Sequence, residues 1–264
     1  MCIDYFKEKT ELMMLVVVSP AKKLNMNPLN KIDTTEPFFK EDVKNLVEIA
    51  RDLSSEQLKD LMGISPKLAE LNKERFMSFG NQEKKAALFA FAGDTYKGLD
   101  AEKLNKIDLE WAQKYLRILS GLYGLLRPLD SIEPYRLEMG SKLKGNHGNT
   151  LYEYWDNKIS QSLNEYAQEI GTNTLVNCAS NEYFSVIKPN TLALKVVTPV
   201  FMERKNGKDK IISFYAKNAR GAMARFIIQN QITEVENIKN FNLDRYSYNH
   251  SISDESKFIF IRES

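Results

Sequence analysis

The chain has 264 residues, of which 43% are hydrophobic and 27% charged, and its formal net charge is +2. This is ordinary globular composition, so any affinity for nucleic acid must come from local clusters of lysine and arginine. Two cysteines are too few for a disulfide framework, and no apolar run approaches the roughly 20 residues of a membrane span. These features favour a reduced, cytoplasmic protein over a secreted or membrane protein.

The chain opens with charges where a signal peptide is apolar, which argues against secretion. Met13 and Met14 stand immediately before the first apolar run, so we expect residues 1–13 to be an optional N-terminal extension with an alternative start. No low-complexity linker or internal repeat divides the remainder, which predicts one domain over residues 14–264. The apolar run 15–18 predicts a buried strand that delivers Ser19 and Lys22 to its end.

The apolar spacing predicts alternating strands and helices after this first strand. The predicted helices cover residues 42–53, 54–62, 66–75, 108–115, 152–170 and 215–230. The predicted strands cover residues 86–91, 174–178, 192–202, 210–214 and 257–261, with Asn206-Gly207 as a hairpin turn. This alternation indicates a single compact α/β domain with a mixed sheet flanked by helices.

The stretch 117–140 reads RILSGLYGLLRPLDSIEPYRLEMG, a buried strand that ends in a charged loop. Pro128 and Pro134 remove amide donors and stiffen the loop, which presents Arg127 and Arg136 among acidic residues. Stiff charged loops after buried strands often carry function, but ion-paired turns have the same composition. Both interpretations remain open for these two arginines.

Residues 58–71, LKDLMGISPKLAEL, fit a helix-hairpin-helix element. In that interpretation Gly63 forms the tight turn, and backbone amides at the start of the second helix bind a phosphate with help from Lys67. Ser65 stands where the usual motif has a second glycine. A helical hairpin without a ligand therefore remains an alternative.

A second basic cluster lies in FYAKNARGAMARFI, residues 214–227. Lys217 and Arg220 are three residues apart, so on a helix they share one face, and we expect both to be exposed. The preceding hairpin adds Arg204, Lys205, Lys208 and Lys210. The cluster predicts a phosphate-binding surface, with an ordinary solvated helix face as the alternative.

The sequence offers little for catalysis or for binding a cofactor or metal. His147 and His250 are isolated in polar segments, and neither glycine-rich nucleotide-binding motif is present. We therefore assign no catalytic residue, cofactor or metal ligand. Asp94 with Lys22 remains a possible pair if their two strand ends are neighbours.

Five ordered blocks resemble the YaaA-type peroxide stress response family. They are VVSPAKKL (17–24), FAGDTYKGL (91–99), the stretch 117–140, NCASNEYF (177–184) and FYAKNARGAMARFI (214–227). The resemblance implies a cytoplasmic protein that protects cells from hydrogen peroxide, partly by limiting free iron. It also implies a compact α/β fold with a basic cleft and a helix-hairpin-helix element that bind double-stranded or distorted DNA.

Two main hypotheses follow, and an iron-handling protein is a weaker third, because the sequence lacks an obvious cluster of metal ligands. In the first, a monomer binds DNA phosphates without catalysis. Its contacts would be Lys22, Gly63, Ser65, Lys67, Arg127, Arg136, Lys217 and Arg220. In the second, an enzyme acts on a nucleotide or nucleic acid in a strand-end pocket formed by Ser19, Lys22 and Asp94, with Arg127 and Arg136 holding phosphate.

Overall fold

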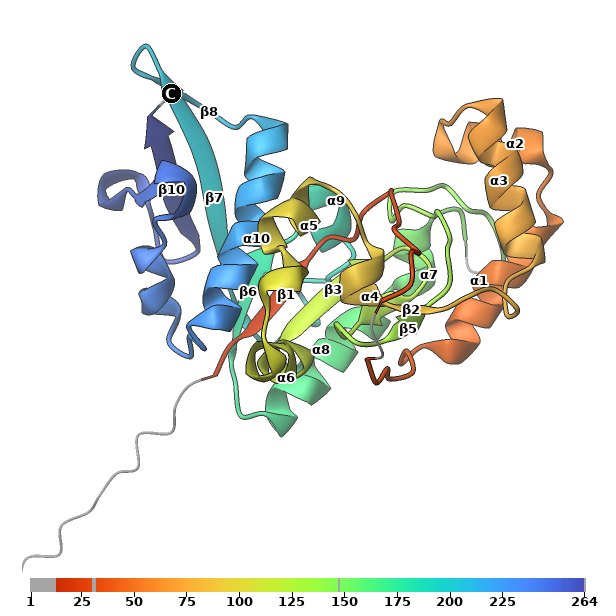
Figure 1. The fold of residues 1–264 in the computed structure, drawn as a ribbon, viewed down its shortest axis with the longest axis horizontal. Coiled ribbons are helices and arrows are strands. Elements are labelled where there is room, and N and C mark those ends of the chain that lie inside the picture. Colours follow the sequence, from red (N-terminus) through yellow and green to blue (C-terminus); the bar gives the residue numbers. More distant parts are fainter. Residues whose placement is uncertain (1–12, 30–31, 147, 264) are drawn as a thin grey trace, which may run out of the picture.

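The computed structural model describes residues 13–29, 32–146 and 148–263, and it confirms the α/β class with a mixed sheet flanked by helices (Figure 1). Residues 1–12, which make up most of the predicted extension, and His147 lie outside the described residues. The main sheet contains β1 (Leu15–Val18), β3 (Leu116–Ser120), β4 (Gly124–Leu126), β6 (Thr174–Cys178), β7 (Lys195–Lys205), β8 (Lys208–Lys210), β9 (Ser247–Tyr248) and β10 (Lys257–Glu263). A small second sheet pairs β2 (Lys85–Ala86) with β5 (Ser131–Ile132).

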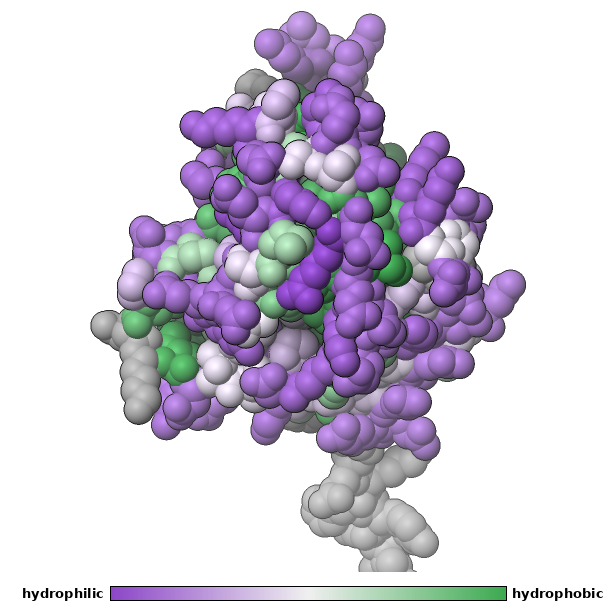
Figure 2. Space-filling view, turned by 90° about the vertical axis from the view of Figure 1, so that its right-hand side faces the viewer, coloured by the Kyte–Doolittle hydropathy of each residue, from purple (hydrophilic) through white to green (hydrophobic). Residues whose placement is uncertain are grey.

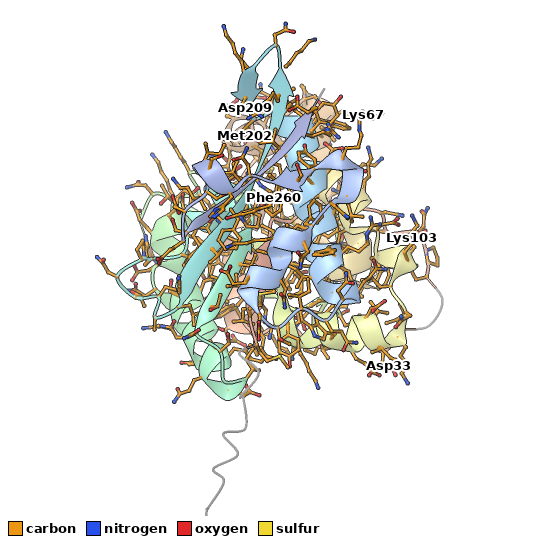
Figure 3. All side chains as sticks on the ribbon, turned by 90° about the vertical axis from the view of Figure 1, so that its left-hand side faces the viewer. Asp33, Lys67, Lys103, Met202, Asp209 and Phe260 are labelled. Carbon is orange, nitrogen blue, oxygen red and sulfur yellow. The ribbon has the colours of Figure 1, made fainter. Side chains whose placement is uncertain are left out.

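The α-helices lie on both faces of the main sheet and at one end of the molecule. They are α1 (Lys40–Asp52), α2 (Ser55–Met62), α3 (Pro66–Met77), α4 (Ala87–Ala90), α5 (Asp94–Leu99), α6 (Lys106–Tyr115), α7 (Leu151–Trp155), α8 (Lys158–Glu169), α9 (Asn181–Phe184) and α10 (Ser213–Gln229). Short 3-10 turns occupy Ala101–Lys103, Val235–Asn240, Leu243–Arg245 and His250–Ile252. Figure 3 looks onto the sheet from its β10 end and shows Phe260 of β10 in the middle of the packed side chains.

The strand order is β4-β3-β1-β6-β7-β10-β9, with β8 paired to β7. The five strands from β3 to β10 are parallel, while β4, β8 and β9 are antiparallel to their neighbours. From β1 the chain goes to β3 on one side and later returns to β6 on the other. The connections therefore diverge between β1 and β6, and in open α/β sheets this switch point is where ligands bind, outside the carboxyl ends of the strands.

All four residues of β1 are buried, with at most 1% of their surface exposed. A strand covered on both faces needs a continuous apolar run, so the pattern LVVV predicts its central place. Val18 of β1 pairs with Cys178 of β6, which brings the ends of these strands together. The predicted strand at 174–178 is confirmed as β6, and the strand at 257–261 is confirmed within β10.

The predicted strand at 86–91 is wrong, because only Lys85 and Ala86 are extended and α4 follows. The amides of Ala87 and Leu88 donate to the carbonyls of Asp130 and Pro128 at 2.8 and 2.9 Å. These hydrogen bonds hold the start of α4 against the loop after β4. The chain therefore forms a helical turn there and does not join the main sheet. A short apolar run does not by itself distinguish these outcomes.

The predicted helix over 152–170 is also divided, into α7 and α8. Asp156 has a positive φ of 37° and interrupts the helix directly after Trp155. Trp155 is fully buried, and its indole Nε1 donates to the carbonyl of Gly121 at 3.0 Å. The break lets the Trp155 side chain and α8 pack in different directions. The amphipathic pattern of the sequence does not predict this break, because it depends on tertiary contacts.

The stretch 117–140 contains the predicted buried strand, β3, but also a hairpin that was not predicted. Its turn reaches Gly124, whose φ is 67°, and β4 runs back along β3. A Cβ atom on Gly124 would lie 2.7 Å from the ring of Trp155. Gly124 is therefore required both by the backbone conformation and by the close approach of the indole.

Candidate functional site

A pocket of about 290 Å³ opens at the carboxyl ends of β1 and β6, at the topological switch point. We call it the switch-point pocket, and the residues that matter for its chemistry are Ser19, Lys22, Asp94, Ser180, Lys217 and Arg220. They come from the segments after β1 and β6 and from α5 and α10, which surround this end of the sheet (Figure 1). The structure therefore brings Ser19, Lys22 and Asp94 together, as the enzyme hypothesis requires, and adds Lys217 and Arg220 to them.

The floor of the pocket carries two serine hydroxyls. The Ser180 amide donates to Ser19 Oγ at 2.8 Å, and Ser19 Oγ donates to Ser180 Oγ at 3.3 Å. The Tyr96 hydroxyl donates to the Ser19 carbonyl at 3.2 Å and holds the segment after β1 in place. Ser180 was not among the predicted site residues, although its position just after a parallel strand was a signal that it would meet Ser19.

Two glycines let α5 and α10 approach until their backbones touch. A Cβ atom on Gly221 of α10 would lie 1.7 Å from the Thr95 carbonyl oxygen, and one on Gly98 of α5 would lie 1.9 Å from the Asn218 carbonyl oxygen. Only glycine permits backbones to pass this closely. The contact fixes the two helices that place Asp94, Lys217 and Arg220 around the pocket.

Arg220 is not exposed as predicted but half-buried, and its pKa lies below the ordinary arginine value, mainly because burial disfavours the charged form. Arginine ionises so far above neutral pH that the guanidinium stays charged. It makes no hydrogen bond or ion pair with any residue in the described part of the chain. A half-buried guanidinium at a pocket wall that has no partner among the described residues favours an anionic ligand, although the carboxylates of Asp94 and Glu182 line the same pocket.

Lys217 lies one turn before Arg220 on the same helix and is exposed, as predicted. Its place on the pocket rim adds a second cation from α10. The predicted sharing of a face by Lys217 and Arg220 is therefore confirmed, with one side chain at the rim and the other deeper in the wall.

Cys178 ends β6 beside the pocket and is 1% exposed. Burial raises the pKa of its thiol to about 12, although the positive charge of Arg220 acts in the opposite direction. At neutral pH the side chain is a thiol, and the thiolate is the form that reacts with peroxide or attacks a substrate. Cys178 is therefore a packing residue and not a nucleophile.

Lys22 and Arg136 meet at a shared carboxylate. Glu138 Oε1 lies 3.2 Å from Lys22 Nζ and 3.0 Å from an Arg136 terminal nitrogen. The Glu138 side chain is 9% exposed, whereas that of Lys22 is 63% exposed, so Lys22 keeps most of its access to a ligand. Arg136 is thus brought close to the pocket rim through Glu138, one of the acidic residues of the stretch 117–140 among which it was predicted to lie.

The Arg127 side chain makes several contacts within the protein. Its Nε and terminal nitrogen donate to Asp130 Oδ1 at 3.0 and 2.8 Å, and the same terminal nitrogen donates to the Glu36 carbonyl at 2.7 Å. The guanidinium also lies 4.4 Å from the centre of the Phe38 ring. This geometry supports the ion-paired turn, and the phosphate contact of Arg127 stays a prediction.

Gly63, Ser65 and Lys67 lie in and after the connection between α2 and α3, at the end of the molecule away from α10 (Figure 1). Gly63 has a left-handed conformation with φ 60°, and the Ser65 hydroxyl accepts a hydrogen bond from the Leu68 amide at 3.4 Å. Hydrophilic side chains cover most of the face at this end (Figure 2). All three residues are exposed, and they form a surface separate from the switch-point pocket.

Acids accompany the cations near this connection. Lys59 pairs with Glu56 and lies 3.9 Å from Asp60. Lys73 of α3 donates to the carbonyls of Arg51 and Leu53 at 2.5 and 2.8 Å. Lys67 therefore carries the positive charge at the start of α3.

No group of three or more His, Cys, Asp or Glu side chains in the described residues is arranged to hold a metal ion. Within the same residues, no helix is both long enough and apolar enough to cross a membrane.

Comparison with known proteins places this chain among bacterial relatives of matching length. The family model described as "Peroxide stress protein YaaA" matches residues 14–252. A UPF0246 protein of Ruegeria pomeroyi is 51% identical over 253 residues, which cover 94% of this chain and 98% of that protein. UPF0246 proteins of Idiomarina loihiensis and Saccharophagus degradans are 50% and 48% identical, covering 94% and 95% of this chain and 98% and 100% of theirs.

Proposed function

Because this chain belongs to the YaaA (UPF0246) family of peroxide stress proteins, we propose that it protects the cell by binding double-stranded or distorted DNA in the cytoplasm. In this proposal residues 14–264 form one monomeric domain, and binding limits the iron-dependent oxidative damage that DNA suffers under peroxide stress. The protein holds phosphates through positive charge and does not need to read bases.

The observation that carries the proposal is the convergence of Lys22, Lys217 and Arg220 on the switch-point pocket. They come from two elements that lie far apart in the sequence, and Arg220 lacks a counter-ion in the described structure. A phosphate supplies the charge-assisted hydrogen bonds that such a guanidinium needs. These residues would form the basic cleft that the family resemblance implies, with Arg136 at its edge.

A second contact is proposed at the α2–α3 connection, which would act as the helix-hairpin-helix element. Gly63 and Ser65 would bring backbone amides to a phosphate, and Lys67 would add charge. Since this surface and the pocket lie apart on the molecule (Figure 1), one duplex would contact them at separate phosphates. Substitutions at well-separated sites usually have additive free-energy effects.

The test is a titration of a fluorescent duplex at several salt concentrations. Removing one cation that neutralises a DNA phosphate flattens the slope of log affinity against log salt by about 0.9. Lys217→Ala and Lys67→Ala are each expected to weaken binding and to flatten the slope by about this amount, and the double variant by about twice as much. Arg220→Ala is expected to weaken binding more, because it removes a half-buried, charge-assisted hydrogen-bond donor.

Lys114→Ala is the matched control, since this exposed lysine lies on α6, whose apolar side packs against the core. It should leave both affinity and salt slope unchanged. Binding by the unaltered protein that is absent, or that does not weaken as salt rises, would contradict the proposed DNA binding. If Lys67→Ala changes neither affinity nor salt slope while the pocket variants do, the α2–α3 connection does not touch DNA. The switch-point pocket would then be the remaining contact.

A second candidate function is an enzyme acting on a nucleotide or nucleic acid, and the arrangement of Ser19, Ser180 and Asp94 around the same pocket favours it. In this case Lys22, Lys217 and Arg220 would hold the substrate phosphate. Incubation with DNA and with nucleotides, followed by mass spectrometry, is expected to reveal a product that Ser19→Ala protein does not form. Unchanged substrates with the unaltered protein would reject this candidate while leaving DNA binding open.

A further inference from the structure

Four apolar side chains lie exposed just before and at the start of α10. Ile211 and Ile212 are 54% and 44% exposed, and Phe214 and Tyr215 are 53% and 40% exposed. Single exposed apolar residues are common, but a contiguous cluster marks an interaction site. This cluster, together with Lys205, Lys208 and Lys210 of the adjacent hairpin, is called the aromatic-lysine surface below.

The charges around the cluster are unbalanced. All three of its lysines are exposed, and none forms an ion pair with a residue in the ranges that the structure describes. The nearby acids are already paired. Asp209 binds Arg204 with two contacts of 2.7 Å, and the buried Glu203 binds Arg262 at 2.7 Å and the Tyr246 hydroxyl.

The two rings differ in what they offer a ligand. The Arg262 guanidinium lies over the Tyr215 ring, 4.3 Å from its centre, so part of that ring is already covered. Phe214 meets Tyr215 edge-on, with ring centres 5.5 Å apart and planes at 68°. Lys97 Nζ is 6.0 Å from the centre of the Phe214 ring. Phe214 is therefore the more exposed of the two rings, and Lys97, which is paired with Asp94 at 3.3 Å, lies near it.

The aromatic-lysine surface continues into the switch-point pocket. Lys217, which lines the pocket rim, follows Phe214 by three residues on α10, about 5 Å along the helix axis. On the other side, the hairpin lysines and Ile212 line a hollow of about 320 Å³. Figure 3 looks toward this end, with Asp209 marking the hairpin at the top and Lys67 of α3 on the far side of the molecule.

We propose that the aromatic-lysine surface binds unpaired bases of distorted DNA, with Phe214 as the ring on which a base stacks. An unpaired strand presents flat apolar bases and a regular row of negative charges. This surface presents the exposed Phe214 ring about one helical turn before Lys217, and two residues earlier Ile212 lines the hollow that also holds the hairpin lysines. The inference rests on the DNA binding proposed above and gives it a preference for gaps and bulges. An intact duplex keeps its bases stacked, so it contacts only the lysines.

The experiment compares an intact duplex with a duplex of the same length that carries a short thymine gap. Phe214→Ala is expected to lower affinity for the gapped DNA about tenfold, which is the size of one base stack, and to leave the intact duplex unchanged. Phe214→Trp should restore affinity, because an indole also stacks. Ile107→Ala is the matched control, since Ile107 is an apolar residue of α6 that is 62% exposed. The Ile107→Ala protein should bind the gapped DNA and the intact duplex with unchanged affinity.

A second measurement reports contact directly. With 5-iodouracil placed in the gap, irradiation is expected to cross-link the base to Phe214 or Tyr215, and peptide mass spectrometry would locate the link. Cross-links found elsewhere, together with equal losses of affinity for both DNAs in the Phe214→Ala protein, would overturn the stacking site while leaving DNA binding intact.

The same titration separates this inference from the function on which it rests. If the unaltered protein binds neither DNA, both the proposed function and the stacking site are rejected. The last experiment measures binding of the protein to vesicles that contain phosphatidylserine, because a lipid surface also attracts apolar and basic side chains. Vesicle binding that Phe214→Ala abolishes, with gapped-DNA affinity unchanged, would assign the surface to membranes and overturn the proposal.

Discussion

Replacing Gly221 with alanine is expected to lower the melting temperature by about 4–8 °C and to distort the switch-point pocket. The new Cβ atom would lie 1.7 Å from the Thr95 carbonyl oxygen and 2.7 Å from the Leu99 amide nitrogen. Both obstacles are backbone atoms, so α5 and α10 must separate. Overpacking of this kind costs about 3 kcal/mol or more, and each kcal/mol lowers the melting temperature of a protein near this size by about 2–4 °C.

Alanine favours a helix over glycine by about 1 kcal/mol, which offsets only part of this cost. The pocket is affected because α5 carries Asp94 and α10 carries Lys217 and Arg220. DNA affinity of Gly221→Ala should therefore fall even at temperatures where the protein remains folded. Gly98→Ala should behave in the same way, since it introduces the reciprocal clash with the Asn218 carbonyl.

Thermal melts followed by circular dichroism measure the stability effect, and Lys217→Ala is the control on the same helix. A surface substitution of that kind changes stability by less than about 0.5 kcal/mol. If Gly221→Ala melts at the same temperature as the unaltered protein, the two helices do not touch through their backbones in solution.

The second large effect is expected from Asp130→Ala, which should destabilise the protein by about 3–5 kcal/mol. Asp130 is fully buried and accepts hydrogen bonds from the Arg127 side chain, from the Arg127 amide at 2.8 Å and from the Thr35 hydroxyl at 2.6 Å. Its removal leaves these donors unsatisfied and a cation without its partner. Urea unfolding measured by fluorescence gives the free energy of unfolding directly.

Asp209→Ala is the matched control, because Asp209 also binds an arginine through two contacts but at the surface. Exposed ion pairs contribute little, so its free energy of unfolding should stay close to that of the unaltered protein. Arg127→Ala should lose stability like Asp130→Ala, while its folded form keeps the full salt dependence of DNA binding. A folded, stable Arg127→Ala protein with a flatter salt slope would instead restore Arg127 as a phosphate contact.

Local patterns were enough to predict much of the fold. The run LVVV predicted β1, apolar spacing predicted α1 to α3, and Asn206-Gly207 predicted the turn between β7 and β8, where both residues have positive φ. These features depend on neighbours a few residues apart, so their signal lies within one short window. The second strand of the β7–β8 hairpin was wrongly predicted at 210–214, because β8 covers Lys208–Lys210 and α10 begins at Ser213. Predictions from such short stretches were also wrong at α4 and at the α7–α8 break. There, hydrogen bonds to Pro128 and Gly121, which are distant in the sequence, decide the conformation.

Local sequence patterns and the family match are enough to identify an α/β protein of the YaaA family, with cations in known segments and Ser19 at a strand end. Which of those cations are available to a ligand depends on contacts between segments that lie far apart in the sequence. Arg127 is held by a buried aspartate, Arg136 shares Glu138 with Lys22, and Arg220 lines a pocket without a counter-ion in the described chain. The reason is that a charged side chain is neutralised by opposite charges within a few ångströms of it. The strand order and the α5–α10 contact decide which residues lie that close, and these residues are far apart in the sequence.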